Sequence, residues 1–377
     1  PLFANLALGG FACAHNGNLT NTHSIKKKLV ESGSIFQTSS DTEIILQLVA
    51  RSRKKKLIDK LIDTLNQIKG AYSLVILTNK KLIGVRDPFG IRPLVLGDKD
   101  GSPVLASETC ALDMIGAKYV RDVENGEIVI ITEKGIESIK PFKIISERPC
   151  IFERIYFASP DSIVGNKTVY TYRKSLGVEL AKENNISADV IVPIPDSGVS
   201  AALGFSQKSS IPFELGIIRS HYVGRTFIEP SQSIRQFGVK LKHSVNRSCI
   251  ENKRVILIDD SIVRGTTASK IVKMVYEAGA KEVHLGISCP PIKHPDFYGI
   301  DTPNYDELIA SKSNIEEMTK MVGAKSLFFL SLSGTYKAMG CKERNAKSPQ
   351  FTDHCFTGEY PIDVSEILKI NSKNDKW

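Results

Sequence analysis

The chain has 377 residues, of which 42% are hydrophobic and 24% are charged, and its formal net charge is +9. This length favours two or three domains over one, and no apolar run is long enough for a membrane span. The positive charge suits anionic ligands, but basic residues are not interleaved with aromatic ones, which argues against nucleic acid as a partner. Seven cysteines without CxxC spacing argue against a disulfide framework and fit a cytoplasmic protein.

From residue 7 to about 140, the sequence predicts an antiparallel sheet with helices packed against it. The run ALGGFACAH is a predicted strand that ends at a turn formed by Asn16 and Gly17. Ser40 and Glu43 have the spacing of a capping box and open a predicted helix over DTEIILQLVA. AYSLVILT and KLIGVRD, joined by a tight Asn-Lys turn, form one predicted hairpin, and EIVIITEKGIESI forms another.

From residue 188 onward, continuous apolar strands alternate with amphipathic helices, which is typical of a parallel sheet covered on both faces. ADVIVPIP, SAALGFSQKS and FELGIIR form one predicted strand-helix-strand unit. KRVILIDD, TTASKIVKMVYEAGA and KEVHLGIS form a second, whose helix stops at Gly279. Prolines between residues 141 and 160 mark the join, so we divide the chain into domains 1–145 and 146–377, the second with a helical carboxyl-terminal region.

The motif VILIDDSIVRGTT at 255–267 is the most specific signal in the chain. Ligands bind beyond the carboxyl ends of parallel strands, where Asp259 and Asp260 are expected to face sugar hydroxyls or a hard cation such as Mg²⁺. The loop that follows, from Arg264 through Gly265 and Thr266 to Thr267, offers backbone N–H groups, hydroxyls and a helix amino terminus for a phosphate. Taken alone, an acidic pair at this place is equally consistent with a helix-capping turn.

This motif resembles the signature of the type I phosphoribosyltransferases, which bind 5-phosphoribosyl 1-diphosphate with Mg²⁺. The resemblance implies that Asp259 and Asp260 contact ribose hydroxyls or metal and that residues from Ser261 to 267 hold the 5-phosphate. It also implies that the loop Asp196-Ser197-Gly198 receives the diphosphate, with Ser197 near the metal. Without the resemblance, that loop reads as a turn and helix cap.

The segment RSHYVGRTFIEPSQSIRQ at 219–236 suits a loop that closes over an anionic ligand, although it could also be a plain surface loop. It resembles the flexible loop of the glutamine phosphoribosylpyrophosphate amidotransferases, which implies that Tyr222 and Arg225 contact the substrate. HNGN, SSDTE and RDPFGIRPLVLG resemble the glutaminase domain of the same family. The implied fold is an incomplete N-terminal-nucleophile glutaminase sandwich of α+β class, followed by the α/β doubly wound sheet of a type I phosphoribosyltransferase.

Within the glutaminase part, the resemblance implies that Asn16 and Gly17 form an oxyanion hole and that Asp41 holds the glutamine α-amino group. The expected reaction uses glutamine or ammonia and phosphoribosyl diphosphate to give 5-phosphoribosylamine, the first step of de novo purine synthesis. Ammonia would pass between the two parts when the loop at 219–236 closes. Purine nucleotides are expected inhibitors, and a homo-oligomer is the expected assembly.

Two departures from the family pattern limit these expectations. The glutaminase nucleophile of the family is a cysteine at the mature amino terminus, where this sequence has Pro1, and Cys13 has an amide rather than an amine at its nitrogen. We therefore expect a preceding segment, and we expect the chain as given not to hydrolyse glutamine. Cys150 matches one ligand of the iron-sulfur cluster that some members carry, but Asp296 stands in place of another, so no cluster is expected.

Two other classes of function fit the sequence less well. A purine regulator that senses phosphoribosyl diphosphate without catalysis would need a helix-turn-helix or winged-helix segment, which the first half lacks. A base-salvage phosphoribosyltransferase would have no use for 140 residues of glutaminase-like sequence. The sequence therefore favours the amidotransferase.

Overall fold

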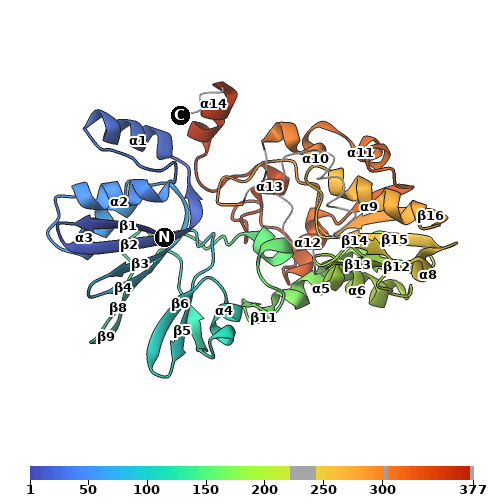
Figure 1. Ribbon diagram of the computed structural model, residues 1–377, viewed down its shortest axis with the longest axis horizontal. Coiled ribbons are helices and arrows are strands. Elements are labelled where there is room, and N and C mark those ends of the chain that lie inside the picture. The colour runs from blue at the N-terminus through green and yellow to red at the C-terminus, as the bar shows by residue number, and fades with distance from the viewer. Residues whose placement is uncertain (221–242, 301, 303, 374–377) are drawn as a thin grey trace.

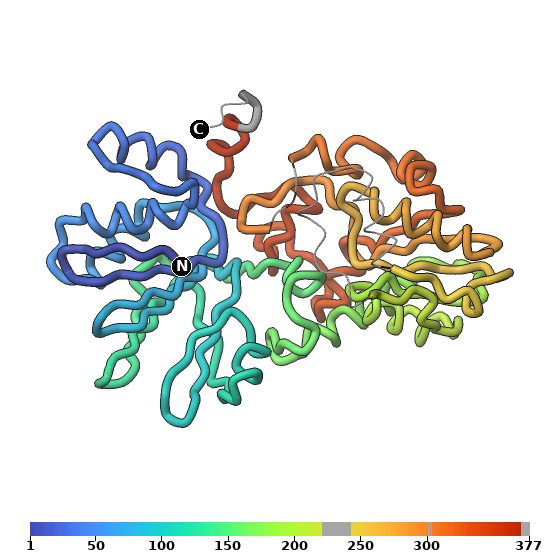
Figure 2. The backbone as a smooth tube through the Cα atoms, in the orientation of Figure 1, coloured from blue at the N-terminus to red at the C-terminus, as the bar shows by residue number. Residues whose placement is uncertain are grey.

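The computed structural model describes residues 1–220, 243–300, 302 and 304–373. The chain forms two lobes, with the first part of the sequence in one and the second part in the other (Figures 1 and 2). The carboxyl-terminal helix α14 (Ser365–Lys373) returns to the first lobe beside α1 (Thr22–Glu31) (Figure 1). There the Ser24 N–H donates to Glu366 Oε1 at 3.0 Å, which ties the end of the described chain to its beginning.

The first lobe is built on a six-stranded sheet in the order β1-β2-β3-β4-β8-β9, in which every neighbouring pair is antiparallel. Its strands are β1 (Leu2–Leu6), β2 (Gly9–Leu19), β3 (Gly70–Thr78), β4 (Leu82–Arg86), β8 (Ile128–Thr132) and β9 (Gly135–Ile139). The helices of this part are α1, α2 (Thr42–Arg51), α3 (Leu57–Leu65) and α4 (Thr109–Met114). The predicted antiparallel sheet with helices is confirmed.

The two hairpins predicted for this sheet are confirmed. β3 and β4 pair with Leu77 opposite Leu82, and the Thr78 N–H donates to the Lys81 carbonyl at 2.9 Å, which leaves a two-residue turn. β8 and β9 pair up to Thr132 opposite Gly135. In each hairpin, the hydrophobic pattern and the turn residues agree on the register.

The turn predicted at Asn16 and Gly17 is wrong. Strand β2 runs through both residues, with Asn16 opposite Ser73 and Gly17 opposite Tyr72. Gly17 has a φ of +145°, and an added Cβ there would lie 2.1 Å from the Ala71 carbonyl oxygen. Glycine is therefore needed for a close approach of two strands, and not for a reversal of the chain.

The capping box predicted for α2 is also wrong in its details. Ser40 Oγ accepts from the Thr42 N–H at 3.3 Å, but the Glu43 carboxylate does not reach back to Ser40. It accepts instead from the N–H groups of Gln37 and Thr38, each at 2.8 Å. Glu43 thus fixes the loop before the helix, a role that its spacing from Ser40 does not reveal.

A smaller sheet packs near this one, with the order β6-β5-β7. Its strands are β5 (Val95–Lys99), β6 (Ser102–Ala106) and β7 (Lys118–Asp122). Leu94, Leu96 and Val123 pack with Val129 and Ile131 of β8, so one face of the large sheet is covered here. A separate core, which includes Ile44, Ile45, Leu61, Leu74 and Ile76, lies between the large sheet and its helices.

The second lobe contains a four-stranded parallel sheet in the order β12-β15-β16-β17. Its strands are β12 (Val190–Pro193), β15 (Arg254–Asp259), β16 (Glu282–Ile287) and β17 (Ser326–Phe329). Helices α5 (Val169–Glu183) and α6 (Val199–Ser209) lie on one side of the sheet, and α9 (Thr266–Glu277) and α11 (Ile315–Val322) lie on the other (Figure 1). Helices on both faces confirm the doubly wound arrangement, including the helix stop at Gly279, whose φ is +98°.

The strand predicted over FELGIIR is only partly correct. Phe213 makes an isolated parallel bridge with Ile191, but β13 (Ile217–Arg219) pairs antiparallel with β14 (His243–Val245) in a sheet of its own. The first predicted strand-helix-strand unit therefore does not return fully to the parallel sheet. An apolar run marks a buried strand but does not say which neighbour that strand pairs with.

The remaining elements are shorter. They are a π-helix (Glu153–Phe157), β10 (Ile163–Val164), β11 (Lys167–Thr168), α8 (Arg247–Ile250), a 3-10 helix (Tyr305–Glu307), α10 (Ile309–Lys312), α12 (Leu332–Ala338) and α13 (His354–Thr357). Among the described residues, no helix combines the length and apolar character that crossing a bilayer requires.

Candidate functional site

Two loops of the second lobe meet at the carboxyl ends of neighbouring strands. β12 and β15 pair in parallel with Pro193 opposite Ile258, so the segments that follow them emerge side by side. Ser197 Oγ, from the first loop, donates to Asp259 Oδ1 at 3.3 Å. The structure thus brings together the two sequence motifs that were predicted to bind one ligand, at the edge of the sheet where ligands of such folds bind.

The acidic pair is partly withdrawn from solvent. Asp260 is only 5% exposed, and its Oδ2 accepts from Ser261 Oγ at 2.6 Å. Burial, followed by the charge of Asp260, raises the pKa of Asp259 well above its usual range. Two carboxylates in this situation favour a cation or hydroxyl donors between or beside them, so the residues fit Mg²⁺. The described residues include no cluster of three or more metal-binding side chains, so Mg²⁺ would have to share its coordination with ligand oxygens.

The glycine-threonine loop has the geometry of an anion site. Gly265 has a φ of +76° and stands at the N-cap of α9, so the helix begins at Thr266 with its first N–H groups directed towards the loop. The Arg264 guanidinium pairs with Glu307, with Nε 2.6 Å from Oε2. A cavity of about 500 Å³ lies beside these residues.

The other predicted residues of this lobe are placed as follows. The Asp196 carboxylate pairs with the Arg219 guanidinium at the end of β13. Gly198 is packed so closely that an added Cβ would lie 2.2 Å from the Ile258 carbonyl oxygen, which holds the first loop against β15. Tyr222 and Arg225 lie outside the described residues, as does most of the predicted closing loop.

In the first lobe, Asp41 contacts the strand that contains Asn16 and Gly17. Asn16 and Gly17 belong to β2, and Asp41 Oδ2 accepts from the N–H of Leu19, two residues further along that strand, at 2.9 Å. Asp41 Oδ1 also lies 3.4 Å from His15 Nδ1. Burial raises the pKa of Asp41, but the hydrogen bonds from His15 and Leu19 outweigh it and lower that pKa below its usual range. A carboxylate held ionised in this way can pair with an ammonium group.

A cavity of about 640 Å³ opens beside Asp41. It lies between α1, the loop before α2 and α14, and Leu19, Lys26, Ser39 and Ile367 are among its lining residues. A cavity of this size holds a small polar ligand. Because α14 comes from the end of the described chain, no local pattern predicts that it forms a wall of this cavity.

One segment of the second lobe touches strand β2 beside the predicted oxyanion residues. Asn18 Nδ2 donates to the Phe297 carbonyl at 3.0 Å. A Cβ added to Gly299 would lie 2.8 Å from the Gly17 backbone. The two lobes therefore meet at the residues that were assigned to the glutamine reaction. Sequence reasoning missed this contact, because the partners are about 280 residues apart and no periodicity links them.

The same segment begins with a buried contact between an aspartate and a histidine. Asp296 Oδ2 lies 2.8 Å from His354 Nε2, and both side chains are at most 2% exposed. Asp296 Oδ1 accepts from the N–H groups of Tyr298 and Ile300, at 2.7 and 2.9 Å, and so shapes the segment that reaches β2. Cys150 and Cys355 line a small cavity beside the pair.

Comparison with known proteins agrees with the division of the chain into two lobes with separate sites. The model of a glutamine amidotransferase domain matches residues 1–114, and that of a phosphoribosyl transferase domain matches residues 174–301. The solved structure of Bacillus subtilis glutamine phosphoribosylpyrophosphate amidotransferase with ADP and GMP superposes with a TM-score of 0.91 at 47% identity, covering 97% of this chain and 80% of that one.

Curated relatives extend the match along the sequence. The Rhizobium etli amidophosphoribosyltransferase is 58% identical over 367 residues, which are 96% of this chain and 74% of the relative. Amidophosphoribosyltransferase 1, chloroplastic, of Arabidopsis thaliana is 49% identical, and the match covers 97% of this chain but 64% of that protein. The two lobes, their loops and these matches together show that the chain belongs to the amidophosphoribosyltransferases, the enzymes of the first step of purine biosynthesis.

Proposed function

We propose that this chain joins ammonia to the anomeric carbon of 5-phosphoribosyl 1-diphosphate, with release of diphosphate, to give 5-phosphoribosylamine. The observation that carries the proposal is the contact between Ser197 and Asp259, which unites the two loops at one edge of the parallel sheet. The loop from Ser261 to Thr267 would hold the 5-phosphate through its N–H groups. Asp259 and Asp260 would hold the ribose hydroxyls or Mg²⁺.

The departing diphosphate requires neutralisation of its charge more than it requires a strong base. When bound, Mg²⁺ supplies part of that neutralisation, with Ser197, Asp259 and Asp260 as its protein partners. Ser197 and Gly198 present the amino terminus of α6 to the diphosphate, and Tyr222 and Arg225 are proposed to close over it. Positioning of ammonia and sugar then supplies much of the rate.

Diphosphate release from the sugar diphosphate, Mg²⁺ and ammonia tests this assignment. Asp259→Asn and Asp260→Asn should each reduce turnover by about 100-fold, because each removes a charge from the site. Glu277→Gln, at the far end of α9 where the side chain is 51% exposed, is the matched control and should keep full turnover. Full activity in both aspartate variants would overturn the proposal, and release that requires a free purine base would indicate a salvage enzyme.

For the glutamine reaction we propose the roles that the sequence suggested. The Asn16 side chain and the Gly17 N–H would stabilise the oxyanion, and the ionised Asp41 would pair with the glutamine α-amino group in the adjoining cavity. The contact of Phe297 and Gly299 with β2 supports passage of ammonia between the lobes, because it places a segment of the second lobe directly against the proposed oxyanion residues.

We further propose that none of the seven cysteines of this sequence is the glutaminase nucleophile. Cys13 is buried within β2, and burial raises the pKa of its thiol to about 12. Burial also raises the pKa of Cys150 to about 12. A polypeptide with this sequence should therefore turn over with ammonia and not with glutamine. Glutamine-dependent product from it would disprove this point without touching the ammonia reaction.

Three further points are proposals on the same basis. The Bacillus subtilis structure is a complex with ADP and GMP, and we propose that purine nucleotides inhibit this chain. Titration of the ammonia reaction with GMP tests this point. We propose that the chain carries no iron-sulfur cluster, because Asp296 contacts His354 where a cluster ligand would stand. The absorbance spectrum of the purified protein tests this point. We also propose that the domain boundary lies between residues 145 and 146.

A further inference from the structure

The Asn16 side chain is held at both ends. Its Oδ1 accepts two hydrogen bonds from the Arg92 guanidinium, from Nε at 3.2 Å and from Nη2 at 3.0 Å. Its Nδ2 donates to Ser107 Oγ at 3.3 Å. A guanidinium has only donors, so the amide oxygen must face Arg92 and the amide NH₂ must face away from it. Arg92 therefore decides which way the Asn16 amide points.

Arg92 is itself fixed by the second lobe. Its Nη1 lies 2.9 Å from Glu153 Oε1, in an ion pair whose side chains are 7% and 9% exposed. The guanidinium also lies over the Phe157 ring, 5.6 Å from its centre. Glu153 and Phe157 bound the π-helix that follows the proposed domain boundary. The arginine that contacts Asn16 is thus paired with an acid and a ring from the segment that follows the proposed domain boundary.

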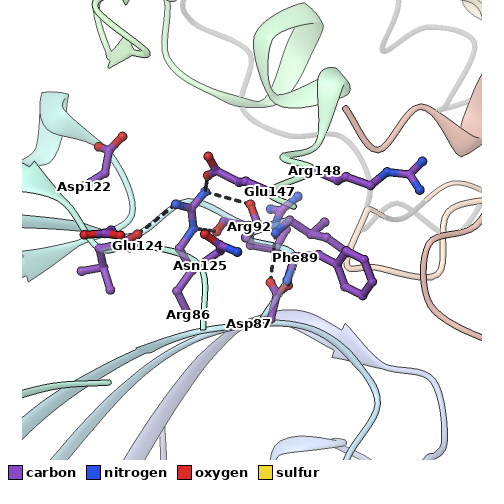
Figure 3. A network of polar contacts seen from close by, with 12 residues as sticks. Arg86, Asp87, Phe89, Arg92, Asp122, Glu124, Asn125, Glu147 and Arg148 are labelled. Atoms are coloured by element: carbon purple, nitrogen blue, oxygen red, sulfur yellow. Dashed lines mark hydrogen bonds and ion pairs between the residues drawn. The ribbon is translucent and has the colours of Figure 1, made fainter. Parts of the chain in front are cut away.

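The backbone that carries Arg92 is held by a network of polar contacts (Figure 3). The Arg92 carbonyl accepts from Ser73 Oγ and from Arg86 Nε, each at 3.0 Å. Asp87 accepts from the N–H groups of Phe89 at 2.9 Å and Ile91 at 3.1 Å, which closes the turn before Arg92. The backbone of the RDPFGIRP run is therefore held rigidly, and Arg92, its last arginine, is the side chain that contacts Asn16.

We propose that Arg92 is a positioning residue for the glutamine reaction, which orients the Asn16 amide so that its Nδ2 faces the developing oxyanion. This inference rests on the oxyanion role proposed for Asn16. The long bond from Nδ2 to Ser107 is weak enough for an oxyanion to replace it. Glu153 keeps Arg92 in place, so the donor geometry of the first site is set in part by the second lobe.

The test compares glutamine-dependent with ammonia-dependent turnover. Both are measured in a form of the protein that hydrolyses glutamine. Arg92→Gln should lower kcat with glutamine by 10-fold to 100-fold, somewhat less than the loss of an oxyanion donor outright. KM for glutamine and turnover with ammonia should stay within about twofold, because binding and the second site are untouched. Arg92→Lys, which keeps a charge beside Glu153, should recover part of kcat.

Asn16→Ala separates this inference from the proposal on which it rests. If Asn16→Ala leaves glutamine turnover intact, the oxyanion role fails and the inference fails with it. If Asn16→Ala abolishes that turnover while Arg92→Gln and Arg92→Lys retain it, only the inference is overturned. Arg344→Gln is the matched control, because Arg344 is also paired to a buried acid, Asp353, at 2.6 Å but has no contact with Asn16 in the structure.

A merely structural role for Arg92 gives a different result. In that case, Arg92→Gln would lower both reactions together and match the loss of thermal stability in Arg344→Gln. Should Arg92→Gln fail to fold, Glu153→Gln carries the test, since it weakens the hold on Arg92 but keeps the side-chain volume. A fall of at least threefold in kcat with glutamine alone supports the inference, and equal losses in both reactions contradict it.

Discussion

Replacing Gly17 by alanine tests whether the close approach of β2 and β3 shapes the glutamine site. The new Cβ would lie 2.1 Å from the Ala71 carbonyl oxygen, and the φ of +145° is unfavourable for alanine. Backbone strain of about 1–2 kcal/mol and overpacking of about 1–3 kcal/mol add to roughly 2–5 kcal/mol. Because each kcal/mol shifts the melting temperature of a domain of this size by about 2–4 °C, the expected decrease is roughly 4–20 °C.

The same change should act selectively on the glutamine reaction. Relief of the contact moves the Gly17 N–H by about 1 Å, and a misplacement of that size can cost about 100-fold in rate. Turnover with ammonia, measured below the melting transition, should be unchanged. Differential scanning fluorimetry and the two activity assays provide the measurements.

Gly33→Ala is the matched control for Gly17→Ala. Gly33 also has a positive φ, of +87°, but nothing lies within 4 Å of an added Cβ. This variant should lose only about 1–2 kcal/mol of stability, the cost of the backbone strain, and keep both activities. Equal decreases in melting temperature for the two variants would refute the reasoning, since the close contact would then contribute nothing.

Three other predictions follow from buried groups. Asp259→Asn should raise the melting temperature of the ligand-free protein while it lowers turnover with ammonia, because a half-buried carboxylate next to Asp260 is unfavourable without a cation. A lower melting temperature would contradict this. Burial raises the pKa of Asp87 to about 6, so the folded state binds its proton more tightly than the unfolded state does. The stabilisation from this group is therefore complete below about pH 4, and about 1–3 kcal/mol of the free energy of unfolding is lost as the pH rises through 6. Urea titrations of Asp87→Asn at several pH values should not show this loss. Gly177→Ala should destabilise the second lobe by at least about 3 kcal/mol, because its Cβ would lie 1.8 Å from the Ala201 carbonyl oxygen between α5 and α6; an unchanged circular-dichroism melting curve would rule this out.

Local patterns were enough to predict the two sheets and the loop after β15. Hydrophobic alternation identified the hairpins of the first lobe, and the apolar run ending in Asp259 and Asp260 identified a buried parallel strand. Both signals depend on residues that are close in sequence, so the chain carries them without reference to its fold. The same residues also indicated a phosphate and cation site, because parallel strands always present their carboxyl ends at one edge.

The failures share a different cause. Asn16-Gly17 has the local preference of a hairpin turn, yet pairing with β3 overrides that preference and keeps both residues in a strand. The run FELGIIR is apolar enough for the parallel sheet, yet most of it pairs elsewhere. In each case, the deciding partner is distant in sequence and competes with a local tendency worth only about 1 kcal/mol.

What the sequence alone determined is the chemistry available at each site: two acids and an anion-binding loop in one part, and an amide, a glycine and an acid in the other. Only the tertiary structure decided how that chemistry is oriented. Arg92 turns the Asn16 amide, Glu153 holds Arg92, and Phe297 meets Asn18 across the lobes. These contacts join residues that are tens to hundreds of positions apart, and their directions are set by packing of the two lobes, which no local pattern encodes.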